Sequence, residues 1–218
     1  MERNPDIPFT YFYSQPSEYR FSLDSIEMAW AVAQYLQESR PDLNLSQCQA
    51  LDLCAGCGVI GFELNFHLPS LEKIDFVEVQ SEYLPHFEQN LKMAEQKRQK
   101  SLPFEFINKN YQDLVEAKPS KRYQLILCNP PYFLPEQGKM SPSDFKNRCR
   151  FFLDSSFEKL IECLISSLAM DGEAFLLLRP LEDHGHDLLS DLKKLIKGTI
   201  QCENLAMVRG TFLLRLYH

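Results

Sequence analysis

The chain carries Asn129-Pro130-Pro131-Tyr132 near its middle, directly after an apolar run at residues 123–128. The apolar run predicts a buried strand, which the prolines must end because they cannot donate ladder hydrogen bonds. The resulting stiff turn offers the Asn129 side-chain oxygen, the Pro130 carbonyl and the ring of Tyr132. An NH2 group that donates to both oxygens, with the ring stacked on its planar system, would be oriented for attack on a carbon. We expect Asn129, Pro130, Pro131 and Tyr132 to be catalytic, although a turn that merely ends a strand has the same composition.

A glycine-rich loop separates a predicted strand from a predicted helix, and it runs Asp52-Leu53-Cys54-Ala55-Gly56-Cys57-Gly58-Val59-Ile60-Gly61. Glycines let a backbone approach a ligand closely, and a helix amino end offers unpaired N–H groups. The glycines also satisfy the pattern G-x-G-x-x-G, which would indicate an NAD enzyme. However, the Asp52 carboxylate would repel a pyrophosphate, whereas it suits a ligand cation. The D-x-x-x-G-x-G form resembles motif I of S-adenosylmethionine-dependent methyltransferases, and the cofactor-binding residues expected from it are Asp52, Cys54, Ala55, Gly56 and Gly58.

Further candidates for the cofactor follow the next two predicted strands. Glu78 ends the run at residues 74–78, where a carboxylate can accept both ribose hydroxyls. Asn110 and Asp113 follow the third strand and are candidates to meet the adenine ring of the cofactor, although Asn110 equally suits a turn or helix cap. Asn129 would border the same cofactor. Cys54 begins a C-x-x-C pattern, but no second Cys/His pair follows at suitable spacing, so we expect no metal and no redox pair.

The elements that must position these residues alternate between strands and helices. Repeated strand–helix units imply parallel strands covered on both faces, and two final runs separated by Arg209-Gly210 predict a hairpin. The expected fold is therefore α/β, a Rossmann-like class I methyltransferase plan whose seven-stranded, mostly parallel sheet has an antiparallel last strand. We expect Asp24 to cap the first helix, and a Ser155-x-x-Glu158 signal to open the helix at 154–169. The other helices are expected at 58–67, 81–99 and 182–197, and the strands at 49–54, 73–79, 103–108, 123–128, 172–178, 199–208 and 211–217.

The wider sequence resembles the bacterial tRNA1(Val) adenine-N6 methyltransferase family. The resemblance rests on Tyr19-Arg20-Phe21-Ser22-Leu23-Asp24-Ser25, on the glycine loop and on Asn129-Pro130-Pro131-Tyr132-Phe133. It implies that S-adenosylmethionine is the cofactor and that an adenine in RNA, in particular tRNA, is the substrate. It also implies that residues 1–45 cover the cofactor site of a methyltransferase domain at 46–218. Phe21 and Asp24 would then be neighbours of the cofactor.

The sequence leaves other functions open. Protein-glutamine N5 methyltransferases use a similar turn but generally add a helical amino-terminal domain, and about 45 residues precede the glycine loop here. Methylation of a small-molecule amine is a third possibility. A non-catalytic binding module with the cofactor fold is a fourth, and the intact Asn129 turn argues against it.

Charge and composition bear on the partner. The net charge of −7 is unusual for a nucleic-acid-binding protein, but residues 133–150 hold four basic residues against two acidic ones. Loops as long as residues 133–152 are usually functional or disordered, so we expect this one to be mobile and to close over the base. Tyr132 and Phe133 would then contact the base, and Arg148 or Arg150 a phosphate. The seven cysteines and the absence of an apolar signal core or membrane span predict a cytoplasmic protein, and we expect a monomer.

Overall fold

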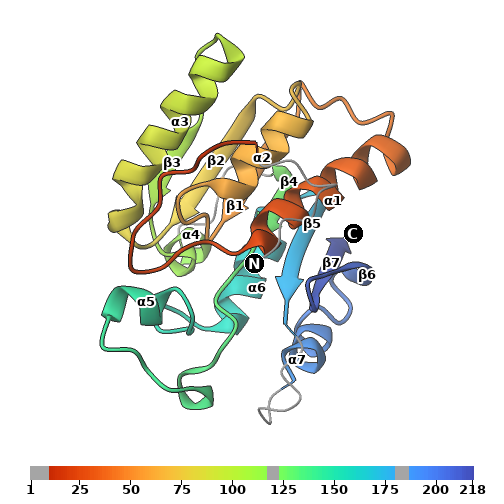
Figure 1. The fold of residues 1–218 in the computed structure, drawn as a ribbon. Coiled ribbons are helices and arrows are strands. Elements are labelled where there is room, and N and C mark those ends of the chain that lie inside the picture. Colours follow the sequence, from red (N-terminus) through yellow and green to blue (C-terminus); the bar gives the residue numbers. More distant parts are fainter. Residues whose placement is uncertain (1–9, 117–122, 180–186) are drawn as a thin grey trace.

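The computed structural model describes residues 10–116, 123–179 and 187–218. Seven strands form one sheet in the order β3-β2-β1-β4-β5-β7-β6 (Figure 1). The first five strands pair in parallel, and β7 runs antiparallel between β5 and β6. The strands are β1 (Gln49–Leu53), β2 (Lys73–Glu78), β3 (Glu105–Asn108), β4 (Tyr123–Cys128), β5 (Leu168–Leu178), β6 (Gln201–Val208) and β7 (Thr211–Tyr217). The predicted sheet, with its antiparallel last strand, is confirmed.

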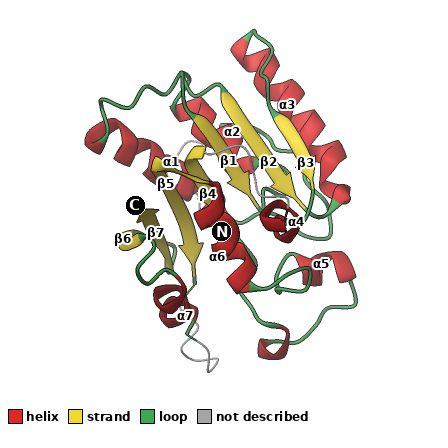
Figure 2. Ribbon diagram, turned by 180° about the vertical axis from the view of Figure 1, so that it is seen from behind, coloured by secondary structure: helices red, strands yellow, loops and turns green. Residues whose placement is uncertain are grey.

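Helices cover both faces of the sheet, as predicted. Alternate residues of β4 enter two separate hydrophobic cores, with Leu125 and Leu127 in one and Ile126 and Cys128 in the other. The first core is covered by α1 (Leu23–Ser39), α2 (Val59–His67) and α3 (Leu84–Arg98), and the second by α6 (Phe157–Ser167) and α7 (Leu188–Leu195). Figure 2 shows α6 crossing the second face. Both faces are therefore apolar, as a parallel sheet requires.

Several predicted boundaries were wrong, and the caps explain two of them. The cap of α1 is Ser22, and Asp24 lies in its first turn, where a carboxylate favours the helix dipole. Helix α6 begins at Phe157, after Ser156, whose hydroxyl accepts a hydrogen bond from the Lys159 N–H. Ser155 instead donates to the Gln112 side chain. Strand β5 begins where α6 ends, at Leu168, rather than at residue 172.

The remaining differences are mostly short elements that lack a clear sequence period. The helix expected at 81–99 divides into a 3-10 turn η1 (Ser81–Tyr83) and α3. Residues 182–186 of the last predicted helix lie outside the described residues. Three further elements were not predicted, namely α4 (Tyr111–Glu116), η2 (Pro135–Gln137) and α5 (Asp144–Arg148). Among the described residues, no helix is long and apolar enough to cross a membrane.

The amino-terminal segment is fastened across α2 and α3 before it enters α1 (Figure 1). Buried Glu63 of α2 accepts hydrogen bonds from the hydroxyls of Thr10 and Tyr13, at 2.6 and 2.7 Å. The backbone of Ser14 pairs with the Asn90 side chain of α3 in both directions. These contacts hold the segment in place as it runs toward the carboxyl ends of the central strands.

Candidate active site

A cavity of about 360 Å³ lies at the carboxyl ends of β1, β2 and β4. This is where open parallel sheets bind ligands. Its walls come from the glycine loop, the end of β2, the Asn129 turn, the amino-terminal segment and the loop after α5. Of the residues expected from sequence, those in the lining are Phe21, Asp24, Cys54, Ala55, Gly56, Glu78, Asn129, Pro130, Pro131, Tyr132, Phe133, Arg148 and Arg150. One cavity thus collects both halves of the predicted site.

The glycine loop makes a tight turn beside this cavity. Gly56 and Gly58 have φ values of 55° and 86°, in the left-handed region that favours glycine. A Cβ atom on Gly58 would lie 2.7 Å from the Phe62 ring and 3.0 Å from the Phe87 ring. Gly58 is the amino-terminal cap residue of α2 and is absent from the lining. Its position requires glycine for folding rather than for direct contact with a ligand.

Glu78 is held in a fixed orientation at the end of β2. Its two carboxylate oxygens accept hydrogen bonds from the backbone N–H groups of Gly56 and Gln80, each at 2.9 Å. Burial raises the pKa of Glu78, while these hydrogen bonds oppose the shift. The carboxylate therefore joins the glycine loop to β2 and keeps lone pairs for a hydroxyl-bearing ligand.

Asp52 does not lie where the sequence suggested. It is fully buried and absent from the cavity lining, and its Oδ2 accepts a hydrogen bond from the Gly61 N–H at 2.9 Å. Burial raises the pKa of Asp52 to about 8. A β-strand points successive side chains to opposite faces, and this one points under α2. The expected contact with a ligand cation is therefore replaced by a contact with the first turn of that helix.

Asn110 serves as a turn and cap residue, the alternative that its sequence context left open. Its Oδ1 accepts from the Gln112 N–H, and its Nδ2 donates to the backbone carbonyl of Asp154. Neither Asn110 nor Asp113 lines the cavity, whereas the neighbouring Lys109 and Tyr111 do. The expected contact of Asn110 with the cofactor is not supported.

The Asn129 turn places a side-chain amide between two hydroxyl groups. Asn129 Nδ2 donates to Ser25 Oγ at 3.2 Å, and Asn129 Oδ1 accepts from the Tyr132 hydroxyl at 2.6 Å. The backbone N–H groups of Tyr132 and Phe133 both donate to the Arg150 carbonyl, which fixes the far side of the turn. Burial raises the pKa of Tyr132, so its hydroxyl keeps the proton that it donates.

The segment after this turn forms a folded wall of the cavity, and its expected mobility stays a prediction. Phe151 is fully buried and forms a parallel β-bridge with Phe133. Arg150 lies over both of these rings, at 5.7 Å from the Phe133 centroid and 5.3 Å from that of Phe151. Arg148 is bound to Asp154 through its Nε, at 2.9 and 3.1 Å from the two carboxylate oxygens. Arg148 is therefore less free than Arg150 to meet a phosphate.

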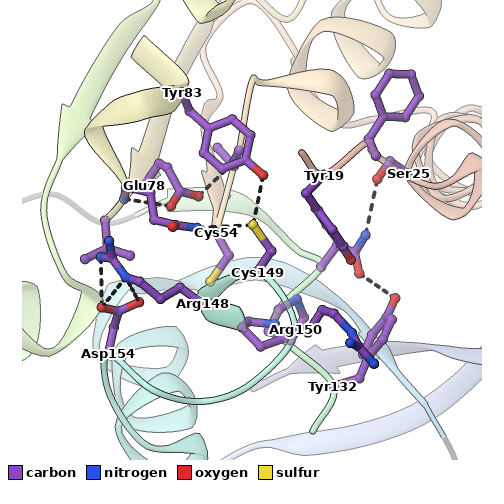
Figure 3. Close-up of a pocket in the computed structure, with 18 of the residues that line it drawn as sticks. Tyr19, Ser25, Cys54, Glu78, Tyr83, Tyr132, Arg148, Cys149, Arg150 and Asp154 are labelled. Atoms are coloured by element: carbon purple, nitrogen blue, oxygen red, sulfur yellow. Dashed lines mark hydrogen bonds and ion pairs between the residues drawn. The ribbon is translucent and has the colours of Figure 1, made fainter. Parts of the chain in front are cut away.

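The cavity also includes residues that the sequence did not single out. Figure 3 shows Cys149 between the two ends of the cavity, near Tyr83. The Cys149 sulfur lies 3.2 Å from both Gln80 Nε2 and the Tyr83 hydroxyl. Burial raises the pKa of this thiol to about 11, so it stays protonated at neutral pH and is a poor nucleophile. All seven cysteines are free, and the described residues contain no group of three or more His, Cys, Asp or Glu side chains that could hold a metal ion.

Arg179 is another such residue, at the end of β5. Its position after a parallel strand is a signal that sequence reasoning could have used. In contrast, the contacts of Cys149 and Asp154 depend on how residues 133–156 fold. No hydrophobic periodicity in the sequence predicts that fold.

Known proteins with related sequences are described as methyltransferases. The family model described as methyltransferase small domain matches residues 21–144. A tRNA1(Val) (adenine(37)-N6)-methyltransferase of Vibrio cholerae is 29% identical over 147 residues, which cover 67% of this chain. The match spans 56% of that relative's length. The resemblance inferred from the sequence motifs is therefore confirmed.

Solved structures show the same fold at low sequence identity. A S-adenosylmethionine-dependent methyltransferase from Agrobacterium tumefaciens superposes with a TM-score of 0.56 and 13% identity, over 91% of this chain and 63% of that one. TrmN from Thermus thermophilus gives a TM-score of 0.55 and 16% identity, over 85% of this chain and 48% of that one. These structures confirm the Rossmann-like methyltransferase fold. Because the family model matches more than half of its residues, the chain belongs to the methyltransferase small domain family.

Proposed function

We propose that this protein is an S-adenosylmethionine-dependent methyltransferase that methylates the exocyclic N6 amine of an adenine in RNA, with tRNA as the leading substrate. The observation that carries the proposal is the position of the Asn129 turn, which borders the same cavity as Gly56 and Glu78. An acceptor-binding turn and a cofactor-binding loop that share one cavity can bring two ligands into contact.

The residues at the Glu78 end fit the cofactor. The fixed carboxylate of Glu78 would accept hydrogen bonds from the ribose hydroxyls. The left-handed turn at Gly56 brings backbone close to the ligand, and Phe21 and Asp24 line the cavity from the amino-terminal segment. When bound, S-adenosylmethionine supplies a methyl group carried on a positively charged sulfur.

The Asn129 end fits an amine on a planar ring. Asn129 Oδ1 would accept one N–H of the adenine amine and the Pro130 carbonyl the other, which orients the nitrogen lone pair toward the methyl carbon. The lone pair of such an amine is delocalised into the ring, so this orientation favours the more pyramidal geometry of the transition state. The rings of Tyr132 and Phe133 line the same part of the cavity and would stack on the flipped base.

Two guanidinium groups are available for the RNA backbone. Arg150 is stacked on Phe133 and Phe151, and the described residues contain no carboxylate in an ion pair with it. Arg179 also lines the cavity and is exposed. We assign the phosphate contacts to these two residues rather than to Arg148, which Asp154 holds.

The choice of adenine rests on the relatives and not on the turn. An Asn129 turn would hold the amide of a protein glutamine equally well, and the Vibrio cholerae relative is named for adenine N6. With an RNA substrate and seven free cysteines, we place the protein in the cytoplasm.

Labelled methyl transfer tests the proposal. Purified protein is incubated with methyl-labelled S-adenosylmethionine, total RNA and total protein from a bacterial extract, alongside Asn129→Ala and a control, Asn204→Ala, which changes an exposed asparagine on β6. We expect label in RNA from the wild type and the control, and far less label from Asn129→Ala. Label in protein glutamine without label in RNA would overturn the adenine assignment.

Binding of S-adenosylhomocysteine, measured by calorimetry, separates the cofactor from the acceptor. We expect the wild type and Asn129→Ala to bind it, and Glu78→Ala to bind it at least about tenfold more weakly, since a buried charged hydrogen-bonding group is lost. A wild-type protein that binds NAD but not S-adenosylhomocysteine would overturn the proposed cofactor.

A further inference from the structure

Ser25 is a buried polar residue that joins the amino-terminal segment to the Asn129 turn. It lies in the first turn of α1, its side chain borders the cavity, and only 6% of the residue is exposed. Its Oγ lies 3.2 Å from Asn129 Nδ2, across 104 positions of sequence. Figure 3 shows Ser25 and Tyr132 at the same end of the cavity.

The two ends of the Asn129 amide are chemically different, and only one of them suits the acceptor. Oδ1 accepts hydrogen bonds, whereas Nδ2 only donates them. An adenine amine that approaches the turn brings two N–H donors, so Nδ2 facing the amine would oppose binding. The amide must therefore keep Nδ2 away from the acceptor throughout the reaction.

The contact with Ser25 holds the amide in place. Nδ2 donates to Ser25 Oγ while Oδ1 accepts from the Tyr132 hydroxyl, so the amide is bound on both sides and its oxygen lies toward Tyr132. The acceptor amine would compete with Tyr132 for Oδ1, but nothing in the reaction replaces Ser25 at Nδ2. We propose that Ser25 is a positioning residue for methyl transfer, one that keeps Asn129 Oδ1 directed at the acceptor amine. This inference rests on the proposed function of the Asn129 turn.

The role differs from that of a serine that only fills space in α1. Substitution of a serine that only fills space would change the stability of the fold, and hence the amount of active protein, but not the turnover of each folded molecule. Loss of a positioning residue lowers turnover per folded molecule. It leaves cofactor affinity unchanged, because Ser25 acts on the acceptor side. A positioning residue also tolerates threonine, which keeps the hydroxyl group.

The test compares Ser25→Ala, Ser25→Thr and Ser167→Ala, the last being a buried serine of α6 outside the cavity. Methyl transfer to RNA is measured at saturating cofactor, with each kcat normalised to the number of S-adenosylhomocysteine-binding sites. We expect Ser25→Ala to lower kcat about tenfold, the effect of one lost hydrogen bond, with KM for RNA and cofactor affinity within about twofold of the wild type. Ser25→Thr should recover most of the lost activity, and Ser167→Ala should retain full turnover.

A comparison of Asn129→Ala with the double variant Asn129→Ala/Ser25→Ala tests the inference even if threonine does not fit at position 25. In the Asn129→Ala background, single-turnover transfer should fall no further when Ser25→Ala is added, because the two residues act as one unit. Equal normalised kcat for Ser25→Ala and the wild type, or an undiminished effect of Ser25→Ala without Asn129, would overturn the inference alone. If the wild type transfers no methyl group to RNA, the proposed function fails, and the inference fails with it.

Discussion

The Tyr132 hydroxyl donates a hydrogen bond to Asn129 Oδ1 across 2.6 Å, so the oxygen assigned to the acceptor amine already holds a donor. A carbonyl oxygen has two lone pairs, and the amine must either share this atom with Tyr132 or displace it. The ring and the hydroxyl of Tyr132 therefore have opposite effects on acceptor binding.

Substitutions at Tyr132 separate these effects. Tyr132→Phe keeps the ring and removes the competing donor, so KM for RNA should fall about threefold or more. Tyr132→Ala also removes the stacking surface, and kcat/KM should fall by about tenfold to a hundredfold. Steady-state kinetics on RNA measures both. If Tyr132→Phe were impaired as strongly as Tyr132→Ala, the hydroxyl would be needed for catalysis and the competition argument would be wrong.

Gly58 makes a second prediction, with a matched control on the same chain. Gly58→Ala adds a Cβ 2.7 Å from the Phe62 ring at a left-handed φ, whereas Gly198→Ala adds one at a φ of 79° with no atom within 4 Å. We expect Gly198→Ala to lower the free energy of unfolding by about 1 kcal/mol, the cost of the backbone conformation alone. Gly58→Ala should cost at least about 1 kcal/mol more, because the aromatic rings must move.

Urea denaturation measures both variants, and calorimetry reports their cofactor binding. Gly58→Ala should also weaken binding of S-adenosylhomocysteine, since the loop is displaced, and Gly198→Ala should not. Equal losses of unfolding free energy in Gly58→Ala and Gly198→Ala would contradict this prediction, because the Phe62 ring would then move aside without a free-energy penalty.

Asp52 predicts a pH dependence of stability. Its pKa is about 8 in the folded protein and about 3.9 in an unfolded chain. Between these values the unfolded chain binds fewer protons than the folded protein, so this residue makes stability fall as pH rises. Asp52→Asn places an amide where the protonated carboxyl lies and removes the dependence. The unfolding free energy of the variant minus that of the wild type should therefore increase from pH 5 to pH 8.

Denaturation at pH 5, 6, 7 and 8 gives the difference in unfolding free energy between wild type and variant. Asp42→Asn, an exposed position in the loop after α1, controls for the loss of one negative charge. A constant difference between Asp52→Asn and the wild type across this range would mean that Asp52 is ionised in the folded protein.

The sequence predicted the sheet and the ends of its strands better than it predicted the contacts made there. Glu78 and Asn129 could be placed because one apolar strand ends at Glu78 and another just before Asn129, and the carboxyl ends of parallel strands meet at one edge. Asp52 follows the same rule by position, yet a one-residue change in a strand reverses the face to which a side chain points. Its contact with Gly61 depends on how α2 packs, which no local pattern specifies.

The wall formed by residues 133–156 was least predictable. The length of residues 133–152 indicated a mobile loop but gave no fold for it, and in the structure a few large side chains, in particular Phe145 and Phe151, enter the interior. Pairing of Arg148 with Asp154 follows from that fold. Ser25 was visible in the sequence as part of a motif, but its contact with Asn129 joins residues on separate elements and needed the structure.

The salt dependence of RNA affinity tests the different roles assigned to Arg150 and Arg148. Arg150→Ala should raise KM for RNA and lower the slope of log affinity against log salt by about 1, as expected for one lost phosphate contact. Arg148→Ala should instead destabilise the wall, because Asp154 loses its partner. Lys193→Ala on α7 controls for the loss of a distant positive charge. An unchanged salt slope in Arg150→Ala would remove Arg150 from the RNA contact.

The central claim is that the Asn129 turn directs methyl transfer to an exocyclic amine of RNA. The most direct measurement is nucleoside mass spectrometry of tRNA treated with the protein and S-adenosylmethionine, compared with tRNA treated with Asn129→Ala. We predict N6-methyladenosine as the product of the wild type and far less of it with the variant. Methylation at a ring nitrogen or a ribose hydroxyl, or N6-methyladenosine formed equally well by Asn129→Ala, would contradict the account.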